Sequence, residues 1–114
     1  MLRLISSLLL ASASLFAQDS RGSISGVVTD AQAAGIPKAK VVITNIETGV
    51  DTVLHTNERG AYVAPLLLPG QYRVAAEQEG FKRATRDGVS LSVNDSLQID
   101  IKLDVGSVTE TVNV

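Results

Sequence analysis

The residue with the widest chemical repertoire in this chain is His55, the only histidine among 114 residues that include no cysteine. A zinc site draws three or four ligands from histidine, cysteine and carboxylate side chains, so this supply predicts no zinc site. A serine nucleophile would need a histidine base, and the local alternation places His55 on an open strand beside a turn. We therefore interpret His55 as a solvated strand residue, and we expect no enzyme activity and no cofactor.

Four short polar residues in predicted turns could bring oxygen ligands to a calcium ion: Asp30, Asp87, Asn94 and Asp95. The spaced calcium-loop pattern D-x-[DN]-x-[DN]-G does not occur in the sequence. Side chains of this type commonly accept hydrogen bonds from the backbone of their own turn. We therefore interpret these residues as turn caps and predict no metal site.

Three cations, Lys82, Arg83 and Arg86, follow Phe81 and could bind an anionic glycan or a lipopolysaccharide phosphate. Charges along an edge strand also block pairing with other strands, and we favour this solvated role. The net charge of the whole chain is −2, and no basic stripe is interleaved with aromatic residues. Binding to nucleic acid is therefore not expected.

A sugar-binding platform would need exposed aromatic rings, and the chain has no tryptophan and two tyrosines. Tyr62 and Tyr72 both fall in phase with inward-facing positions, which argues against a strong glycan site. Residues 66–68 are three leucines that precede Pro69. They either cap the end of the domain, which we favour, or form a small exposed contact patch.

The elements that hold these residues are predicted to be strands joined by short turns. Residues 57–60 and the Pro69–Gly70 pair supply turn chemistry, and an alternating strand follows each of them. Turn signals recur about every 8–12 residues, which is typical of an antiparallel sandwich. No segment after residue 17 has the apolar spacing and caps of a helix, so none is expected there.

Three local patterns refine this prediction. Pro65 confines its strand to an edge or an end of a sheet. The Asp87–Gly88 pair predicts a hairpin turn. The clearest strand, buried on one side only, is predicted from four apolar residues that alternate with polar ones, namely Leu97, Ile99, Ile101 and Leu103.

The first 17 residues have the pattern of a secretory signal peptide. Arg3 gives a positive start, residues 4–10 give the apolar stretch, and Ala13 or Ala17 gives the small residue at a cleavage site. The alternative is a short membrane anchor, but the apolar run is well below the ~20 residues that a spanning helix needs. We therefore expect export, with no disulfide to stabilise the domain.

Five motifs occur in order: GSISGVVTD, IPKAKV, TNERGAYV, LPGQYRV and GF, at residues 22–30, 36–41, 56–63, 68–74 and 80–81. This series, which covers residues 22–103, resembles the carboxypeptidase regulatory-like domain, a transthyretin-like sandwich. The resemblance implies a seven-stranded antiparallel Greek-key β-sandwich, of a carbohydrate-binding-like fold, with no chemistry of its own. The sequence departs from the family pattern in its first hairpin, where Gly35 comes late.

Residues 104–114 form a tail that ends in a segment similar to the TonB box and plug entry of large outer-membrane receptors. In such receptors a signal peptide, this domain, a TonB box, a plug and a barrel occur in that order. The resemblance implies that the chain is the N-terminal periplasmic part of a TonB-dependent receptor of a Gram-negative bacterium, or a stand-alone remnant of one. Outer-membrane association would then come from a missing C-terminal part. The partner in uptake or signalling would be TonB or the receptor plug and barrel, bound through Glu110, Thr111, Val112, Asn113 and Val114.

Two other functions and one other place for the tail stay open at this point. The chain could be a carbohydrate-binding accessory module, or a folding or docking domain of a secreted carboxypeptidase. The signal peptide directly precedes the sandwich, which argues against an enzyme attached on that side. The tail could also pair with an edge strand of its own domain, instead of adding as a strand to a partner.

Overall fold

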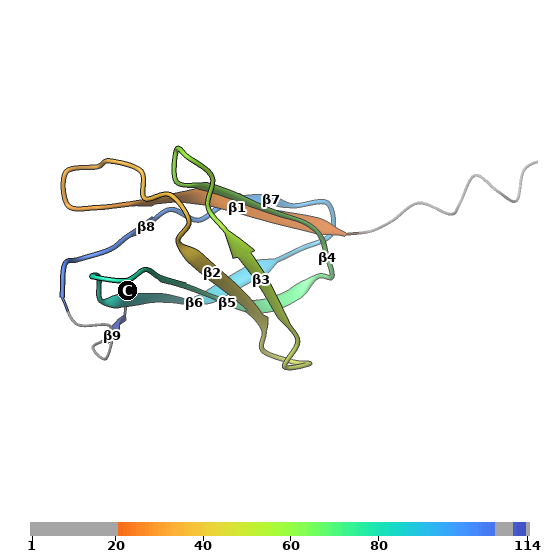
Figure 1. The fold of residues 1–114 in the computed structure, drawn as a ribbon. Coiled ribbons are helices and arrows are strands. Elements are labelled where there is room, and N and C mark those ends of the chain that lie inside the picture. The colour runs from red at the N-terminus through yellow and green to blue at the C-terminus, as the bar shows by residue number, and fades with distance from the viewer. Residues whose placement is uncertain (1–20, 107–110, 114) are drawn as a thin grey trace, which may run out of the picture.

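The computed structural model describes residues 21–106 and 111–113, which form two β-sheets packed face to face (Figure 1). The first sheet has β1 at its centre and consists of β1 (Gly22–Thr29), β4 (Ala61–Leu67), β7 (Ser96–Gln98) and β8 (Ile101–Lys102). The second has the order β3-β2-β5-β6-β9 and consists of β2 (Lys40–Asn45), β3 (Asp51–His55), β5 (Gly70–Glu77), β6 (Arg83–Leu91) and β9 (Thr111–Asn113). The predicted all-β sandwich is therefore confirmed. The described residues include no helix, and hence none that is long and apolar enough to cross a membrane.

The core lies between the sheets and is built from side chains at alternate strand positions. On β1, Ile24 and Val28 are fully buried, and Val41 and Ile43 repeat this on β2. Tyr62 on β4 and Tyr72 on β5 are each 3% exposed, which confirms that both rings lie in the core. The same cluster also contains Ile36, Ala39, Leu67, Val74, Val89, Leu91, Ile101 and Leu103, and the partly buried Leu54 of β3 and Leu97 of β7 pack against it.

The turn at residues 57–60 carries the chain from one sheet to the other. The side-chain oxygen of Asn57 accepts the backbone N–H groups of Arg59, at 2.9 Å, and of Ala61, at 3.0 Å. Gly60 has a φ of +80°, and a Cβ there would lie 2.6 Å from the carbonyl oxygen of Val28. The turn therefore needs glycine at position 60 for both its backbone conformation and the space available. Because the chain leaves for the other sheet here, β3 stays at the edge of its own sheet.

The predicted hairpin at Asp87–Gly88 is wrong. Both residues lie inside β6, which pairs with β5 on either side of them. Between the pairs Tyr72↔Val89 and Val74↔Arg86 the strand β6 has one extra residue, and Gly88 has a φ of +72°. The left-handed glycine therefore forms a β-bulge instead of a turn.

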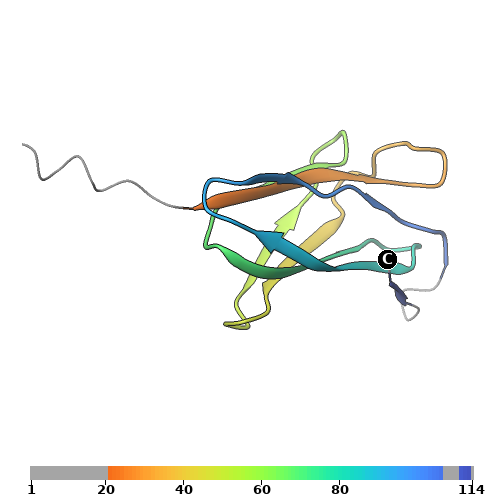
Figure 2. The ribbon, with the colours of Figure 1, turned by 180° about the vertical axis from the view of Figure 1, so that it is seen from behind.

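The last predicted strand lies along β1, and the two run parallel (Figure 2). It is divided into β7 and β8 because a carboxylate interrupts the ladder: Asp100 Oδ1 accepts the N–H of Val27 at 2.9 Å. The N–H of Ile99 still donates to the carbonyl of Ser25 at 2.7 Å, so the register continues across the interruption. Parallel pairing is possible because the whole domain connects these strands, and no short hairpin forces them antiparallel. The sandwich is thus more finely divided, and less uniformly antiparallel, than the sequence predicts.

Candidate interaction surfaces

His55 lies at the exposed end of β3. The part of the chain that the structure describes has no group of three or more histidine, cysteine or acidic residues that could hold a metal ion. His55 instead borders an open groove of about 520 Å³ at one end of the second sheet. Residues from three separate segments line this groove: Lys38, Lys40, His55, Glu77, Gln78, Glu79 and Phe81.

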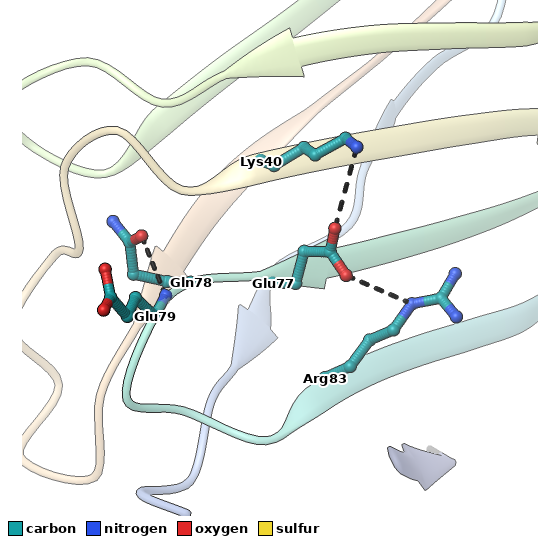
Figure 3. Close-up of polar contacts among 5 residues, drawn as sticks. All are labelled: Lys40, Glu77, Gln78, Glu79 and Arg83. Atoms are coloured by element: carbon teal, nitrogen blue, oxygen red, sulfur yellow. Dashed lines mark hydrogen bonds and ion pairs between the residues drawn. The ribbon is translucent and has the colours of Figure 1, made fainter. Parts of the chain in front are cut away.

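The charges beside this groove neutralise one another (Figure 3). Glu77 on β5 lies between cations of both neighbouring strands, with Lys40 Nζ at 3.7 Å and Arg83 Nε at 3.8 Å from its carboxylate oxygens. All three side chains are more than 40% exposed, so each ion pair contributes little stability. The surface is therefore mixed in charge, which does not single out an anionic ligand.

The structure separates the basic cluster after Phe81. Arg83 extends over its own sheet to Glu77, whereas Arg86 Nη2 donates to the carbonyl of Asp100, at 3.0 Å, near the opposite sheet. The backbone N–H of Lys82 bonds the carbonyl of Asp104 at 2.7 Å. Arg83 and Arg86 therefore do not share one anion site.

Of the four residues predicted to cap turns, Asp30 and Asp95 do so, whereas the prediction is wrong for Asp87, which lies inside β6. Asp30 Oδ1 accepts the N–H groups of Gln32 and Ala34 at 2.9 and 3.0 Å. Asp95 Oδ2 accepts the N–H of Ser92 at 2.8 Å. In the bulge of β6, Asp87 pairs instead with Arg73, and Asn94 occupies a left-handed turn position with a φ of +61°. Their oxygen atoms thus serve separate local structures.

The two tyrosine hydroxyls bond backbone carbonyls inside the domain. Tyr62 donates to Ile99, where burial and then the charge of Asp100 raise the pKa of Tyr62 well above its ordinary value. Tyr72 donates to Leu68 and accepts from the amide of Asn45 at 3.3 Å. Both rings therefore face the core, and neither offers a stacking platform for a sugar.

The leucine run before Pro69 divides between core and surface. Leu67 is 8% exposed and caps the core, while Leu66 and Leu68 are 63% and 52% exposed. Leu66 has a φ of +60°, an uncommon conformation for this side chain. With Val50 these leucines border a small cavity of about 230 Å³ at the end where β1 begins. Both alternatives for this run are thus present in the structure.

The tail provides a short strand on the edge of the second sheet. Thr111–Asn113 form β9, which pairs in parallel with Arg83–Thr85 of β6. This backbone arrangement corresponds to pairing with the domain's own edge strand. Of the five predicted partner-binding residues, Glu110 and Val114 lie outside the described residues, and binding of a partner by this segment stays a prediction.

Comparison with known proteins places these observations in a family. The carboxypeptidase regulatory-like domain matches this chain over residues 23–104. The TonB-dependent transporter Oar of Myxococcus xanthus is 35% identical over an alignment of 128 positions, which covers 93% of this chain and 12% of that protein. The chain thus spans about an eighth of the length of this relative.

Solved structures share the fold at low sequence identity. The Bacillus anthracis TIE protein has a TM-score of 0.64 at 17% identity, over 75% of this chain and 17% of that one. A putative carbohydrate-binding protein of Bacteroides uniformis has a TM-score of 0.60 at 15% identity, over 75% and 42%. The hydroxyquinol 1,2-dioxygenase of Pseudomonas putida has a TM-score of 0.60 at 6% identity, over 80% and 58%. At these identities the likeness shows the fold alone.

Proposed function

We propose, because this chain belongs to the carboxypeptidase regulatory-like domain family, that it is an exported, non-catalytic module of a TonB-dependent outer-membrane receptor. The observation that carries this proposal is the 35% identity to a TonB-dependent transporter, which extends over 93% of the chain. The module would lie in the periplasm, as the N-terminal part of the receptor. Its role would be to make protein contacts during uptake or signalling.

The proposed contact is strand addition by residues 110–114 to the C-terminal domain of TonB. Among the described residues, three residue pairs hold β9 on β6. A strand with so few pairs can leave its sheet at low cost and form the same backbone bonds with a partner. The tail would therefore exchange between the edge of β6 and the partner.

Hydrogen exchange tests this role. On addition of the C-terminal domain of TonB, we expect slower exchange at the amides of residues 111–113. We also expect faster exchange at Arg83–Thr85 of β6, because that edge loses its covering strand. The Val112→Pro substitution removes one backbone donor and should weaken the partner's binding at least tenfold.

The matched control for this experiment is Val63→Pro. Val63 is an exposed valine on β4, in the other sheet, and should leave binding of the partner unchanged. Binding that survives Val112→Pro, or binding without any change at Arg83–Thr85, would contradict the strand-exchange mechanism.

Export makes a separate prediction about the N-terminus. A signal peptide at residues 1–17 should be removed, so mass spectrometry of the periplasmic protein should find a chain that begins at Ser14 or Gln18. A soluble fraction that retains Met1 would contradict export with cleavage. Deletion of residues 4–10 should keep the protein in the cytoplasm.

Among the described residues we find no observation that favours the carbohydrate-binding alternative. Both tyrosines are buried, and Phe81, at the border of the charged groove, is half-buried. A docking domain of a carboxypeptidase has only the name of the family in its favour, whereas the transporter relative aligns along nearly the whole chain. The receptor role therefore has the stronger support.

A further inference from the structure

The strands at or next to the sheet edges, namely β3, β4, β6, β7 and the two-residue β8, differ in how well their edges are protected. β4 carries Pro65, β7 has three residues, and β6 is bulged and partly covered by β9. β3 has five residues, Asp51–His55, without proline, glycine, lysine or arginine. No strand in residues 21–106 or 111–113 pairs with its outer side. β3 is thus the long edge that lacks the usual protection against pairing.

The backbone groups on this outer side can be identified from the ladder with β2. The N–H of Asn45 donates to Val50 at 2.9 Å, and the N–H of Thr56 donates to Ala39 at 3.0 Å. Hydrogen-bonded pairs alternate along an antiparallel ladder, so the even-numbered residues of β3 direct their backbone groups toward β2. The N–H and C=O groups of Asp51, Val53 and His55 therefore point away from the sheet.

The side chains of the same three residues suit pairing of this strand with itself. Asp51, Val53 and His55 are exposed, and Val53 is an apolar residue that is 51% exposed. In an antiparallel arrangement with a two-fold axis at Val53, the two valines face each other. The two-fold axis then creates two equivalent pairs, in each of which Asp51 of one copy faces His55 of the other. Unlike polar groups therefore lie opposite each other.

We propose that β3 pairs with β3 of a second copy of this chain, about a two-fold axis at Val53. The arrangement joins the second sheets of two molecules into one continuous sheet, with about six backbone hydrogen bonds between them. It needs only the sandwich, so it stands or falls independently of the receptor role. The turn at residues 57–60 makes it possible, because it sends the chain to the other sheet and leaves β3 uncovered.

The expected dimer is weak. A stable interface buries about 800 Å² on each partner, and a five-residue edge supplies much less. We therefore expect a Kd of about 100 µM. The protein concentration reaches this value in concentrated solution, or locally when receptors crowd in one membrane.

Sedimentation equilibrium of the exported chain tests this inference with a matched pair of variants. Val53→Lys places two ammonium groups opposite each other at the axis and should raise the Kd at least tenfold. Val63→Lys introduces the same charge at an exposed valine on β4, the edge strand that contains Pro65, and should leave the Kd unchanged. Thermal melts of both variants should stay close to the parent, because neither valine is buried.

A charge exchange tests the register. His55→Asp places two carboxylates opposite each other and should raise the Kd about fivefold. The double change Asp51→His and His55→Asp restores unlike neighbours and should bring the Kd back to within about twofold of the parent. A dimer that is insensitive to these changes would overturn the proposed register.

Amide exchange at rising protein concentration provides a direct readout of the edge. The amides of Asp51, Val53 and His55 should become slower, while those of Thr52 and Leu54, which already bond β2, should be slow throughout. A chain that stays monomeric at about 1 mM, ten times the expected Kd, would overturn the proposal. A dimer that leaves the three outward amides fast would overturn it as well.

Discussion

Replacement of Tyr72 by alanine is expected to lower the free energy of unfolding by about 3–5 kcal/mol. The ring is 3% exposed and packs within the core cluster, so its removal leaves a cavity. Its hydroxyl also bonds the carbonyl of Leu68 and the amide of Asn45, which loses a partner in the buried interior. Since small domains are stable by only about 5–15 kcal/mol, and this chain has no disulfide, the loss is a large fraction of the total.

Urea denaturation measures this effect, and two further variants separate its causes. Tyr72→Phe keeps the ring and should cost about 0.5–1.5 kcal/mol, the usual value of one hydrogen bond. Val63→Ala truncates a side chain that is 61% exposed and should stay within about 0.5 kcal/mol of the parent. Unchanged stability of Tyr72→Ala with altered retention on a glycan column would instead make Tyr72 a sugar-binding residue.

Alternation in the sequence predicts the core well because burial in a sandwich follows a local rule. The period of two places Tyr62 and Tyr72 at inward positions, and both are 3% exposed. The turn at residues 57–60 is predicted for a similar reason, since Asn57 and Gly60 supply its geometry within the segment itself. Local chemistry is sufficient wherever the interacting groups are close in sequence.

The Asp87–Gly88 pair shows where local chemistry is insufficient. A left-handed glycine suits a hairpin turn and a β-bulge equally well. The choice depends on β5, which is long enough to pair with residues on both sides of Gly88. The interruption of the last strand at Asp100 also depends on a distant part of the chain. The Asp100 carboxylate replaces a backbone acceptor for the N–H of Val27, which lies 73 positions earlier in the sequence.

The candidate surfaces were harder to predict than the core. The charged groove combines Lys38, His55 and Glu77, which belong to three segments that only the folded sheet brings together. The open edge of β3 depends on strand order, and no pattern within residues 51–55 signals it. Pro65 is the exception, since a residue without an N–H correctly identifies β4 as an edge strand.

Replacement of Gly26 by alanine is expected to destabilise the domain by about 3–5 kcal/mol, from overpacking and the loss of a hydrogen bond. A Cβ on Gly26 would lie 1.9 Å from the carbonyl oxygen of Ile99 and 2.9 Å from the hydroxyl of Tyr62. The nearer atom belongs to the backbone, so the segment between β7 and β8 must move away from β1. That movement breaks the bond from Tyr62 to Ile99 and strains the bond from Val27 to Asp100.

Urea denaturation of Gly26→Ala, with Gly49→Ala as its control, distinguishes this clash from a general cost of replacing glycine. Gly49 has a φ of +76°, and a Cβ added there would meet no neighbouring atom within 4 Å, so only backbone strain of about 1–2 kcal/mol is expected. Tyr62→Phe should cost about 1 kcal/mol in the parent and almost nothing in the Gly26→Ala background, because the hydrogen bond is already lost. Equal costs of Tyr62→Phe in both backgrounds would show that the segment at Ile99 has not moved. The close approach of β1 to this segment would then not be what requires glycine at position 26.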